Sequence, residues 1–260
     1  MKARSIAIAL LLAAFQVVAQ NNPVHVLASN GMKAVIDDLK PQAERAIGRP
    51  LVIEFGTSSA VKTRIEGGEA FDVAILTSDV IDDLAKSGKI AAGTRAEIAR
   101  CGIGIGVRAG STKPDMRTSD ALKKTLLAAK SITYAQDGAS RTYILQMEDK
   151  LGIADKMKAK TILEQGSVRS NARVADGSAE MVLTLVSEIL PAKGVELVGP
   201  LPENVQHYVG FEAGIGANSK NTDDGKALLK FLASSAVAPT LKAKGMDPAL
   251  RRPITASPKL

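Results

Sequence analysis

Short apolar runs rich in β-branched residues alternate with amphipathic segments along this chain, and this alternation restricts the fold more than any other feature. The predicted strand and helix pairs are 24–27 with 32–40, 51–55 with 61–66, and 71–76 with 79–87. Strands that alternate with helices form mainly parallel sheets covered by helices on both faces. We therefore predict an α/β fold built from mainly parallel sheets flanked by helices.

The run Ile103-Gly104-Ile105-Gly106-Val107-Arg108 interrupts this rhythm. Glycines at alternate positions of a strand allow another backbone to approach closely. We interpret the run as a crossing into a second lobe. The strand 206–211 then returns to the first lobe and forms the other half of a two-strand hinge. The predicted parts are lobe 1 at 20–104 and 211–260, lobe 2 at 105–210, strands at 131–134 and 161–163, and helices at 119–129, 142–151, 179–190 and 225–234.

The first 19 residues are predicted to be a signal peptide. Lys2 and Arg4 form a positive start, an apolar stretch follows, and Val17-Val18-Ala19 is a small-residue cleavage site before Gln20. The apolar stretch is too short for a membrane anchor with these flanks. We expect a periplasmic protein that is not attached to lipid, because no cysteine lies near the cleavage point.

Cysteine, histidine and charge exclude several classes of function. Cys101 is the only cysteine, so there is no internal disulfide, and the two histidines are too far apart in sequence to predict a metal pair. The formal charge falls from +7 to +5 without Lys2 and Arg4, and the positive residues are scattered. Nucleic-acid binding needs a concentrated basic face. We expect a monomer that binds a small anion without cofactor or metal.

Four strand-to-helix turns rich in serine, threonine, asparagine and glycine indicate how an anion would be held. They lie at residues 27–31, 55–59, 137–140 and 166–170, two in each predicted lobe. A helix N-terminus carries unpaired N–H groups and about half a positive charge. Ligands of open α/β sheets bind at the carboxyl ends of the strands. The turns therefore predict an anion site in the cleft between the lobes.

Residues 55–73, FGTSSAVKTRIEGGEAFDV, are the most specific segment of the chain. Together with Ala28-Ser29-Asn30-Gly31 they resemble the periplasmic molybdate-binding proteins of ABC transporters, and the similarity extends through 138–151, 168–169 and 205–214. The resemblance implies the two-lobed type II periplasmic binding-protein fold. It also implies a ligand held by hydroxyl and backbone N–H groups, and an ABC-type permease in the inner membrane as partner.

The resemblance assigns positions one at a time. It places Ser29 or Asn30 and Ser58 at the family's serine positions, places Ser140 and Val168 where backbone N–H groups are supplied, and puts Leu185 or Thr184 where the family has a ligand-binding tyrosine. The candidate ligand-binding residues, including neighbours on the same turns, are Ser29, Asn30, Ser58 and Ser59 in the first lobe and Ser140, Arg141, Val168 and Arg169 in the second.

Arg141 and Arg169 favour an organic acid over an oxyanion, because guanidinium groups bind carboxylates through paired N–H bonds. Residues 174–180 and 187–190 also resemble periplasmic aconitate isomerases, which handle a tricarboxylate. Such an enzyme needs a base and an acid. Asp137, Tyr143 and Tyr134 are near the predicted cleft, but their spacing assigns no catalytic residue. The sequence favours a solute receptor, and the isomerase is the alternative. A sensor subunit for a membrane kinase cannot be distinguished from a receptor by sequence.

Overall fold

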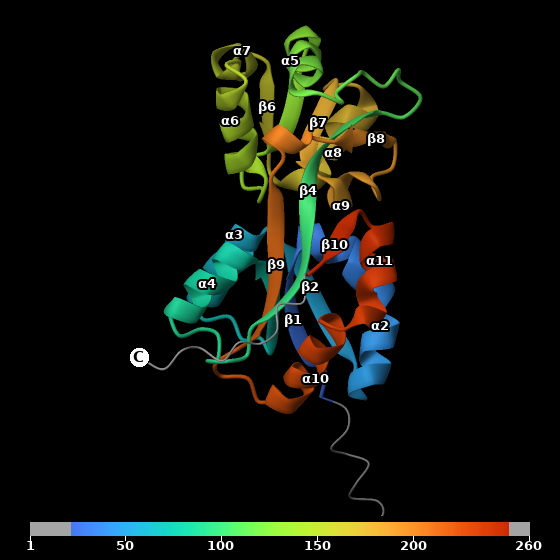
Figure 1. Ribbon diagram of the computed structural model, residues 1–260. Helices are drawn as coiled ribbons and strands as arrows, with labels where there is room; N and C mark the ends of the chain where they lie inside the picture. The colour runs from blue at the N-terminus through green and yellow to red at the C-terminus, as the bar shows by residue number, and fades with distance from the viewer. Residues whose placement is uncertain (1–21, 250–260) are drawn as a thin grey trace, which may run out of the picture.

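The computed structural model describes residues 22–249, which form two lobes (Figure 1). Two long strands, β4 (Ala96–Arg108) and β9 (Tyr208–Ile215), run between the lobes. Within these residues, no helix has the length and apolar character that crossing a membrane requires. The predicted signal peptide, residues 1–19, lies outside the described residues.

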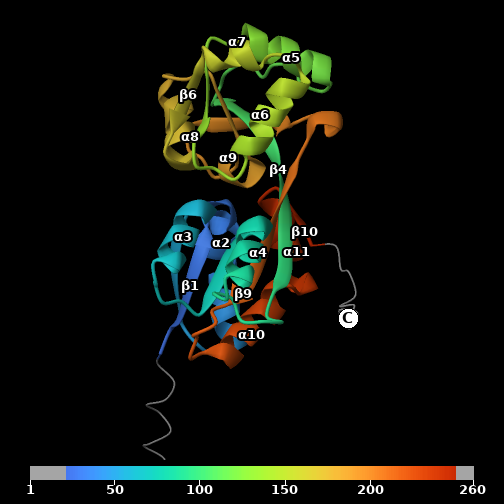
Figure 2. The same ribbon diagram turned by 90° about the vertical axis from the view of Figure 1, so that its left-hand side faces the viewer.

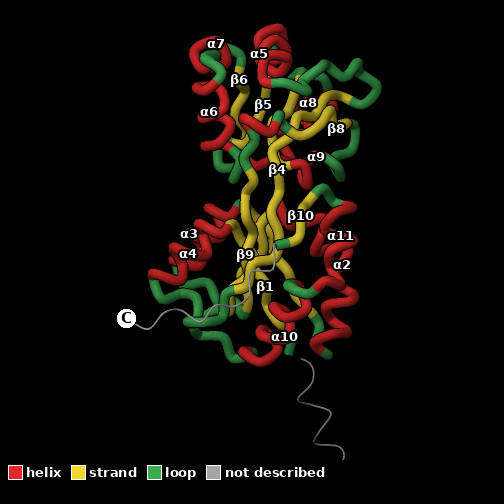
Figure 3. Tube along the Cα trace, in the orientation of Figure 1, coloured by secondary structure: helices red, strands yellow, loops and turns green. Residues whose placement is uncertain are grey.

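The first lobe has a sheet in which three parallel strands lie beside antiparallel ones. Its strand order is β2-β1-β3-β9-β4, and β10 pairs with β4. Helices α2, α10 and α11 lie on one side of the sheet, and α3 and α4 lie on the other (Figures 1 and 3). The elements are β1 (Val24–Ser29), β2 (Leu51–Gly56), β3 (Val73–Thr77), β10 (Met246–Pro248), α2 (Lys33–Ile47), α3 (Ser58–Glu66), α4 (Ser78–Lys86), α10 (Thr222–Leu232), α11 (Ala238–Ala243) and the 3-10 turns η2 (Asn30–Met32) and η4 (Ser235–Val237).

The second lobe repeats this plan on a smaller scale. Strands β5, β6 and β7 are parallel, and β7 and β8 pair with the end of β4 in antiparallel fashion. Figure 2 shows α8 and α9 on one side of this sheet and α5, α6 and α7 on the other. The elements are β5 (Ile132–Ala135), β6 (Thr161–Glu164), β7 (Met181–Leu185), β8 (Val195–Pro200), α5 (Ser119–Ala128), α6 (Arg141–Lys150), α7 (Ala154–Lys158), α8 (Gly166–Asp176), α9 (Val186–Ile189) and the 3-10 turn η3 (Glu203–Val205).

Strand β4 belongs to both sheets. Up to Gly102 it pairs with β9 in the first lobe, and from Ile103 onward it pairs with β7 in the second. A Cβ atom on Gly104 would lie 3.0 Å from the backbone oxygen of Gly199, so the glycine run does allow another backbone to come close. The strand begins at Ala96, earlier than the run at 103–108 indicated. The predicted lobe boundaries at 104/105 and 210/211 stay a prediction.

Aliphatic side chains fill the interior. All five residues of β3 are buried, as expected of a strand covered by helices on both faces. Helix α4 packs against this region through Val80, Ile81 and Leu84, which recur at helical spacing. The packing fixes the strand ends, and therefore the turns that follow them, at the interface between the lobes.

The prediction of one helix over residues 179–190 is wrong. Residues Met181–Leu185 form the strand β7, and only Val186–Ile189 are helical. Every residue of β7 is buried, and four of its five residues are apolar, so the run lacks the alternation of a half-buried strand. Short apolar runs of this kind fit either a buried strand or a buried helix.

Candidate functional site

The four predicted turns lie at carboxyl ends of parallel strands. In the first lobe β1 leads into η2 and β2 into α3, and in the second β5 leads toward α6 and β6 into α8. Side chains and backbone groups of these turns bond across the lobe interface. Three of the four turns meet directly in this way, as described below.

Ser29 and Asn30 end β1 and begin η2. Ser29 is buried, and its hydroxyl oxygen accepts a hydrogen bond from the Gly31 N–H at 3.3 Å. Asn30 is half-buried and lines a cavity between the lobes. Serine at this position is a good helix cap, which explains the tight turn after the strand.

The α3 turn presents two hydroxyls with different roles. Ser58 is buried, and its oxygen accepts a hydrogen bond from the Thr77 N–H at 3.1 Å, so its O–H remains free to donate to a ligand. Ser59 is exposed and donates to the backbone oxygen of Asp137 at 3.3 Å. Thr57 caps the helix by accepting from Ala60 N–H at 3.3 Å.

In the second lobe, Ser140 is buried at the start of α6, and Arg141 next to it is exposed. Val168 and Arg169 lie in the first turn of α8, where backbone N–H groups have no partner within the helix. The Val168 side chain is 73% exposed, so only its N–H suits the predicted role. Within residues 22–249, neither arginine side chain has a hydrogen bond or ion pair, whereas the Arg141 backbone N–H donates to the Gly138 carbonyl oxygen at 3.1 Å.

Asp137 connects the turns of the two lobes. Its carboxylate accepts hydrogen bonds from the Thr57 hydroxyl at 3.2 Å and from the Gly166 N–H, the first of α8, at 2.9 Å. Together with the Ser59 contact, these bonds bring the starts of α3 and α8 to one side chain. The sequence placed Asp137 near the cleft but gave no sign that it bonds to both lobes.

A second tie between the lobes lies beside η2. The Ser187 hydroxyl, at the start of α9, donates to the Gly31 backbone oxygen at 2.8 Å, and both residues are buried. A Cβ atom on Gly31 would lie 2.7 Å from the Phe211 ring and 3.0 Å from Leu185, so this position needs glycine. Leu185, which with Thr184 was one of the two residues predicted to stand at the family's tyrosine position, is therefore packed against η2 as a core residue.

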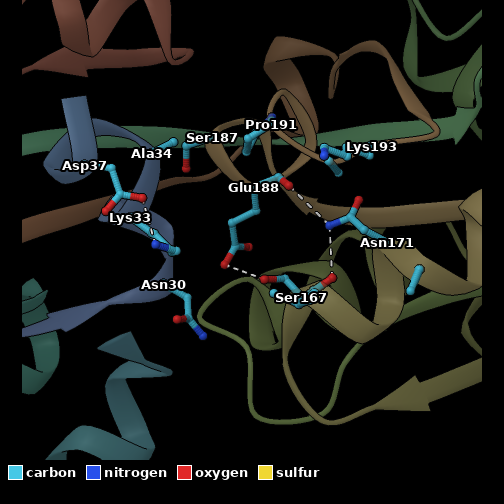
Figure 4. A pocket seen from close by; sticks show the side chains of 13 residues that line it. Asn30, Lys33, Ala34, Asp37, Ser167, Asn171, Ser187, Glu188, Pro191 and Lys193 are labelled. Carbon is cyan, nitrogen blue, oxygen red and sulfur yellow. Dashed lines mark hydrogen bonds and ion pairs between the residues drawn. The ribbon is translucent and has the colours of Figure 1, made fainter. Parts of the chain in front are cut away.

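A cavity of about 410 Å³ opens between the lobes next to Asn30 and Val168. Its walls come from η2 and α2 on one side and from α8, α9 and the segment after α9 on the other (Figure 4). It does not include Ser29, Ser58, Ser59, Ser140, Arg141 or Arg169. Of the eight predicted residues, Asn30 and Val168 therefore line this cavity, and Ser59 is bonded to Asp137 at the lobe interface.

Glu188 reaches into this cavity and was not among the predicted site residues. Figure 4 shows its side chain extending from α9 toward Ser167, with Asn30 and Lys33 across from it. The Ser167 hydroxyl donates to its carboxyl at 2.7 Å, and the Thr184 hydroxyl donates to the other oxygen. Burial raises the pKa of Glu188, although these two hydroxyls oppose the rise. The sequence signal was a lone acid in a run of apolar residues and two hydroxyl residues, Thr184 and Ser187.

The other candidate groups are less suitably placed. Tyr134 is buried in the core of the second lobe, and burial raises the pKa of its hydroxyl. Tyr143 stacks on His207 with ring centroids 3.3 Å apart and lines a separate cavity of about 100 Å³.

Burial raises the pKa of the Cys101 thiol to about 11, so it is unreactive. Among residues 22–249, no cluster of three or more histidine, cysteine, aspartate or glutamate side chains could hold a metal.

Comparisons with known proteins agree with this architecture. The family described as bacterial extracellular solute-binding protein matches residues 24–247. The aconitate isomerase of a Pseudomonas species is 30% identical over 236 residues, which cover 88% of each chain. The molybdate-binding protein ModA of Azotobacter vinelandii is 25% identical over 234 residues, 87% of this chain and 90% of that protein.

A solved structure of the Azotobacter vinelandii periplasmic molybdate-binding protein superimposes with a TM-score of 0.72 at 18% sequence identity, covering 88% of this chain and all of that one. The likeness confirms the predicted type II periplasmic binding-protein fold. The predicted resemblances to molybdate-binding proteins and to aconitate isomerase are both confirmed as sequence similarity. The eight candidate ligand-binding residues stay a prediction.

Proposed function

This chain belongs to the bacterial extracellular solute-binding protein family, and we propose that it captures a small organic carboxylate between its lobes. In this proposal the protein acts in the periplasm, as a monomer, and delivers the ligand to an ABC-type permease. The candidate ligand-binding residues are the eight named from the sequence, with the hydroxyl and N–H groups of the turns as donors.

The observation that carries the proposal is the environment of Asp137. Its carboxylate already accepts hydrogen bonds from the Thr57 hydroxyl of one lobe and the Gly166 N–H of the other. Donors of this geometry therefore fit a carboxylate, and helix N-termini favour negative charge. Leu185 supports the same choice, because an oxyanion ligand would lack the hydroxyl that the family's tyrosine supplies. A lost hydrogen bond to a charged group costs roughly 1.5–3 kcal/mol.

In this proposal the ligand is captured when the two lobes close around it. A ligand that bonds to both lobes stabilises the closed form only by its higher affinity for that form. Strands β4 and β9 are the connections about which the lobes would rotate. The permease would then distinguish the closed, loaded receptor from the open, empty one.

Calorimetry on the purified mature protein tests this function. The protein is first unfolded and refolded by dialysis, so that any bound ligand from the cell is removed. It is then titrated with citrate, trans-aconitate, succinate, acetate, molybdate, tungstate and sulfate. Micromolar binding of a carboxylate supports the proposal, whereas binding of molybdate or tungstate alone overturns the ligand class. No binding of any of these anions at millimolar concentration overturns anion capture.

A second candidate function is isomerisation of a tricarboxylate, as in aconitate isomerase. It is favoured by the 30% identity to that enzyme and by two carboxyls flanking the first turn of α8, Asp137 at Gly166 and Glu188 at Ser167. In an allylic isomerisation, a base removes a proton from the CH₂ group, the double bond shifts, and an acid returns a proton to its far carbon. In this scheme Asp137 would accept the proton from the CH₂ group, and Glu188 would donate the proton to the far carbon.

Incubation with trans-aconitate distinguishes the two functions. Formation of the cis isomer, detected by chromatography, supports the isomerase function. If Asp137→Asn still binds trans-aconitate but no longer forms the cis isomer, Asp137 is supported as the base. If trans-aconitate binds tightly but is not converted over several hours, the result supports a receptor and not an isomerase. The matched control is Asp247→Asn, because Asp247 is an exposed carboxylate on β10 that pairs with Arg100 and does not line the cavity.

A further inference from the structure

The cavity between the lobes begins one residue away from the groups expected to hold the first carboxylate. Asn30 follows Ser29, and Ser167 follows Gly166, whose N–H is bonded to Asp137. Asn30 and Val168 belong both to the predicted anion site and to the cavity wall. A ligand bound at the turns can therefore extend into the cavity without leaving the interface.

The size of the cavity exceeds what a small inorganic anion needs. Its volume of about 410 Å³ lies in the range of roughly 300–1,000 Å³ typical of sites for organic ligands. At about 30 Å³ for each water in the liquid, it has room for on the order of a dozen heavy atoms. A tetrahedral oxyanion would leave most of this space to solvent.

One of the two lysines that line the cavity has no acidic partner among the described residues. Lys33 and Lys193 both line it, whereas Asp37 and Glu188 are its acidic residues. Lys33 is bonded to Asp37 at 2.7 Å, and both side chains are 52% exposed, so this pair exchanges partners at little cost. Lys193 is exposed and has no ion pair among residues 22–249. Figure 4 shows it at the end of the cavity away from Asn30.

Glu188 adds a hydrogen-bonding carboxyl group to the wall of the cavity. Hydroxyls of Ser167 and Thr184 donate to its two oxygens. Burial raises the pKa of its carboxyl, so it carries less negative charge than a surface glutamate at the same pH. The facing charged groups are Lys33 and Asp37 on α2, Asp137 before α6, and Lys193 after α9. Two lysines thus face three acidic groups, so the cavity has no net positive charge, and Lys193 is the cation that a distal carboxylate would reach without displacing an acidic partner.

We propose that this cavity is a subsite for the distal carboxylate of an elongated polycarboxylate, with Lys193 as its cationic partner. The proximal carboxylate lies on the hydroxyl and N–H donors of the turns, and Asn30 contacts both parts of the ligand. The inference rests on the proposed capture of a carboxylate and narrows the ligand to di- and tricarboxylates long enough to span the two positions.

Two variants test the subsite by calorimetry with citrate, succinate and acetate. Lys193→Gln removes the distal charge, and Ala172→Leu, on the exposed side of α8, fills the cavity with a residue that helices accept well. We expect Lys193→Gln to weaken citrate binding about threefold to fivefold, the effect of one accessible ion pair. We expect Ala172→Leu to weaken it more, with acetate affinity unchanged in both.

Lys230→Gln, on the exposed side of α10, is the control for loss of one positive charge and should change no affinity. Equal weakening of all three acids by the cavity variants overturns the subsite, and so does unchanged citrate affinity. If the wild-type protein binds none of the acids, the proposed function fails and the subsite fails with it. If citrate binds both cavity variants as tightly as the wild type, the subsite is overturned while the proposed function stands.

Discussion

The carboxylate of Asp137 in the second lobe accepts a hydrogen bond from the hydroxyl of Thr57 in the first, at 3.2 Å. The same carboxylate accepts from the Gly166 N–H at the start of α8. An internal carboxylate thus holds donors that the proposed ligand would use, and it holds the lobes together while doing so. Asp137 both favours closure and opposes the entry of an anion.

Replacing Asp137 by asparagine should strengthen anion binding about tenfold at low salt. The asparagine oxygen can still accept from Gly166, but the negative charge beside the ligand is removed. Calorimetry at two ionic strengths measures the change, which should shrink as salt screens the charge. Unchanged or weaker affinity would show that Asp137 does not compete with the ligand.

Ser58→Ala should destabilise the first lobe. The buried Thr77 N–H would lose the oxygen that accepts its hydrogen bond, at a cost of about 1–3 kcal/mol. We expect the Tm to fall by several degrees in calorimetric melting. Ser59→Ala, one residue away on the exposed side of the same turn, should leave the Tm nearly unchanged. Equal melting of the two variants would contradict this reading of Ser58.

Gly245→Ala should push the lobes apart. Gly245 precedes β10 in the first lobe, and a Cβ atom there would lie 2.4 Å from Val186 of the second lobe. We expect a larger radius of gyration in X-ray scattering and weaker ligand binding. Gly48→Ala is the matched control, because Gly48 also has a positive φ, 69°, but has no atom within 4 Å of the added carbon. The same expansion in both variants would attribute it to backbone strain.

Glu148 should make stability depend on pH. Burial raises the pKa of its carboxyl to about 7, Asp149 adds to the rise, and one of its oxygens has no hydrogen bond. A carboxyl whose pKa is higher in the folded state binds its proton more tightly there, so stability falls as pH rises from about 4.5 to about 7. The loss is on the order of 3 kcal/mol at most.

Glu148→Gln removes this titration. In urea unfolding we expect the variant to be more stable than wild type at pH 8, with a smaller difference at pH 5. Glu203→Gln, at an exposed position in η3, serves as the control for loss of one carboxylate. Parallel pH profiles for the wild type and Glu148→Gln would contradict the assignment.

Local signals in the sequence were enough for the turns and for most elements. Two of these signals depend only on neighbouring residues: serine or threonine at the start of a helix, and the alternation of strands with helices. The structure has the turns and most of the elements where these signals predicted them. The strand β7 was missed because burial on both faces removes its alternation. The partnership of Thr57 with Asp137 joins residues 80 positions apart, and no local pattern encodes it. Glu188 shows its role only once α8 and β7 place hydroxyls around it.

Strand β4 is one unbroken segment of 13 residues shared by both sheets. Its hydrogen bonds run from one sheet into the other, so it is a continuous connection between the two lobes. In the proposed receptor, rotation about this connection would reorient the outer surfaces of the two lobes relative to each other. A permease that contacts both surfaces would then distinguish the loaded form from the empty one without contacting the ligand.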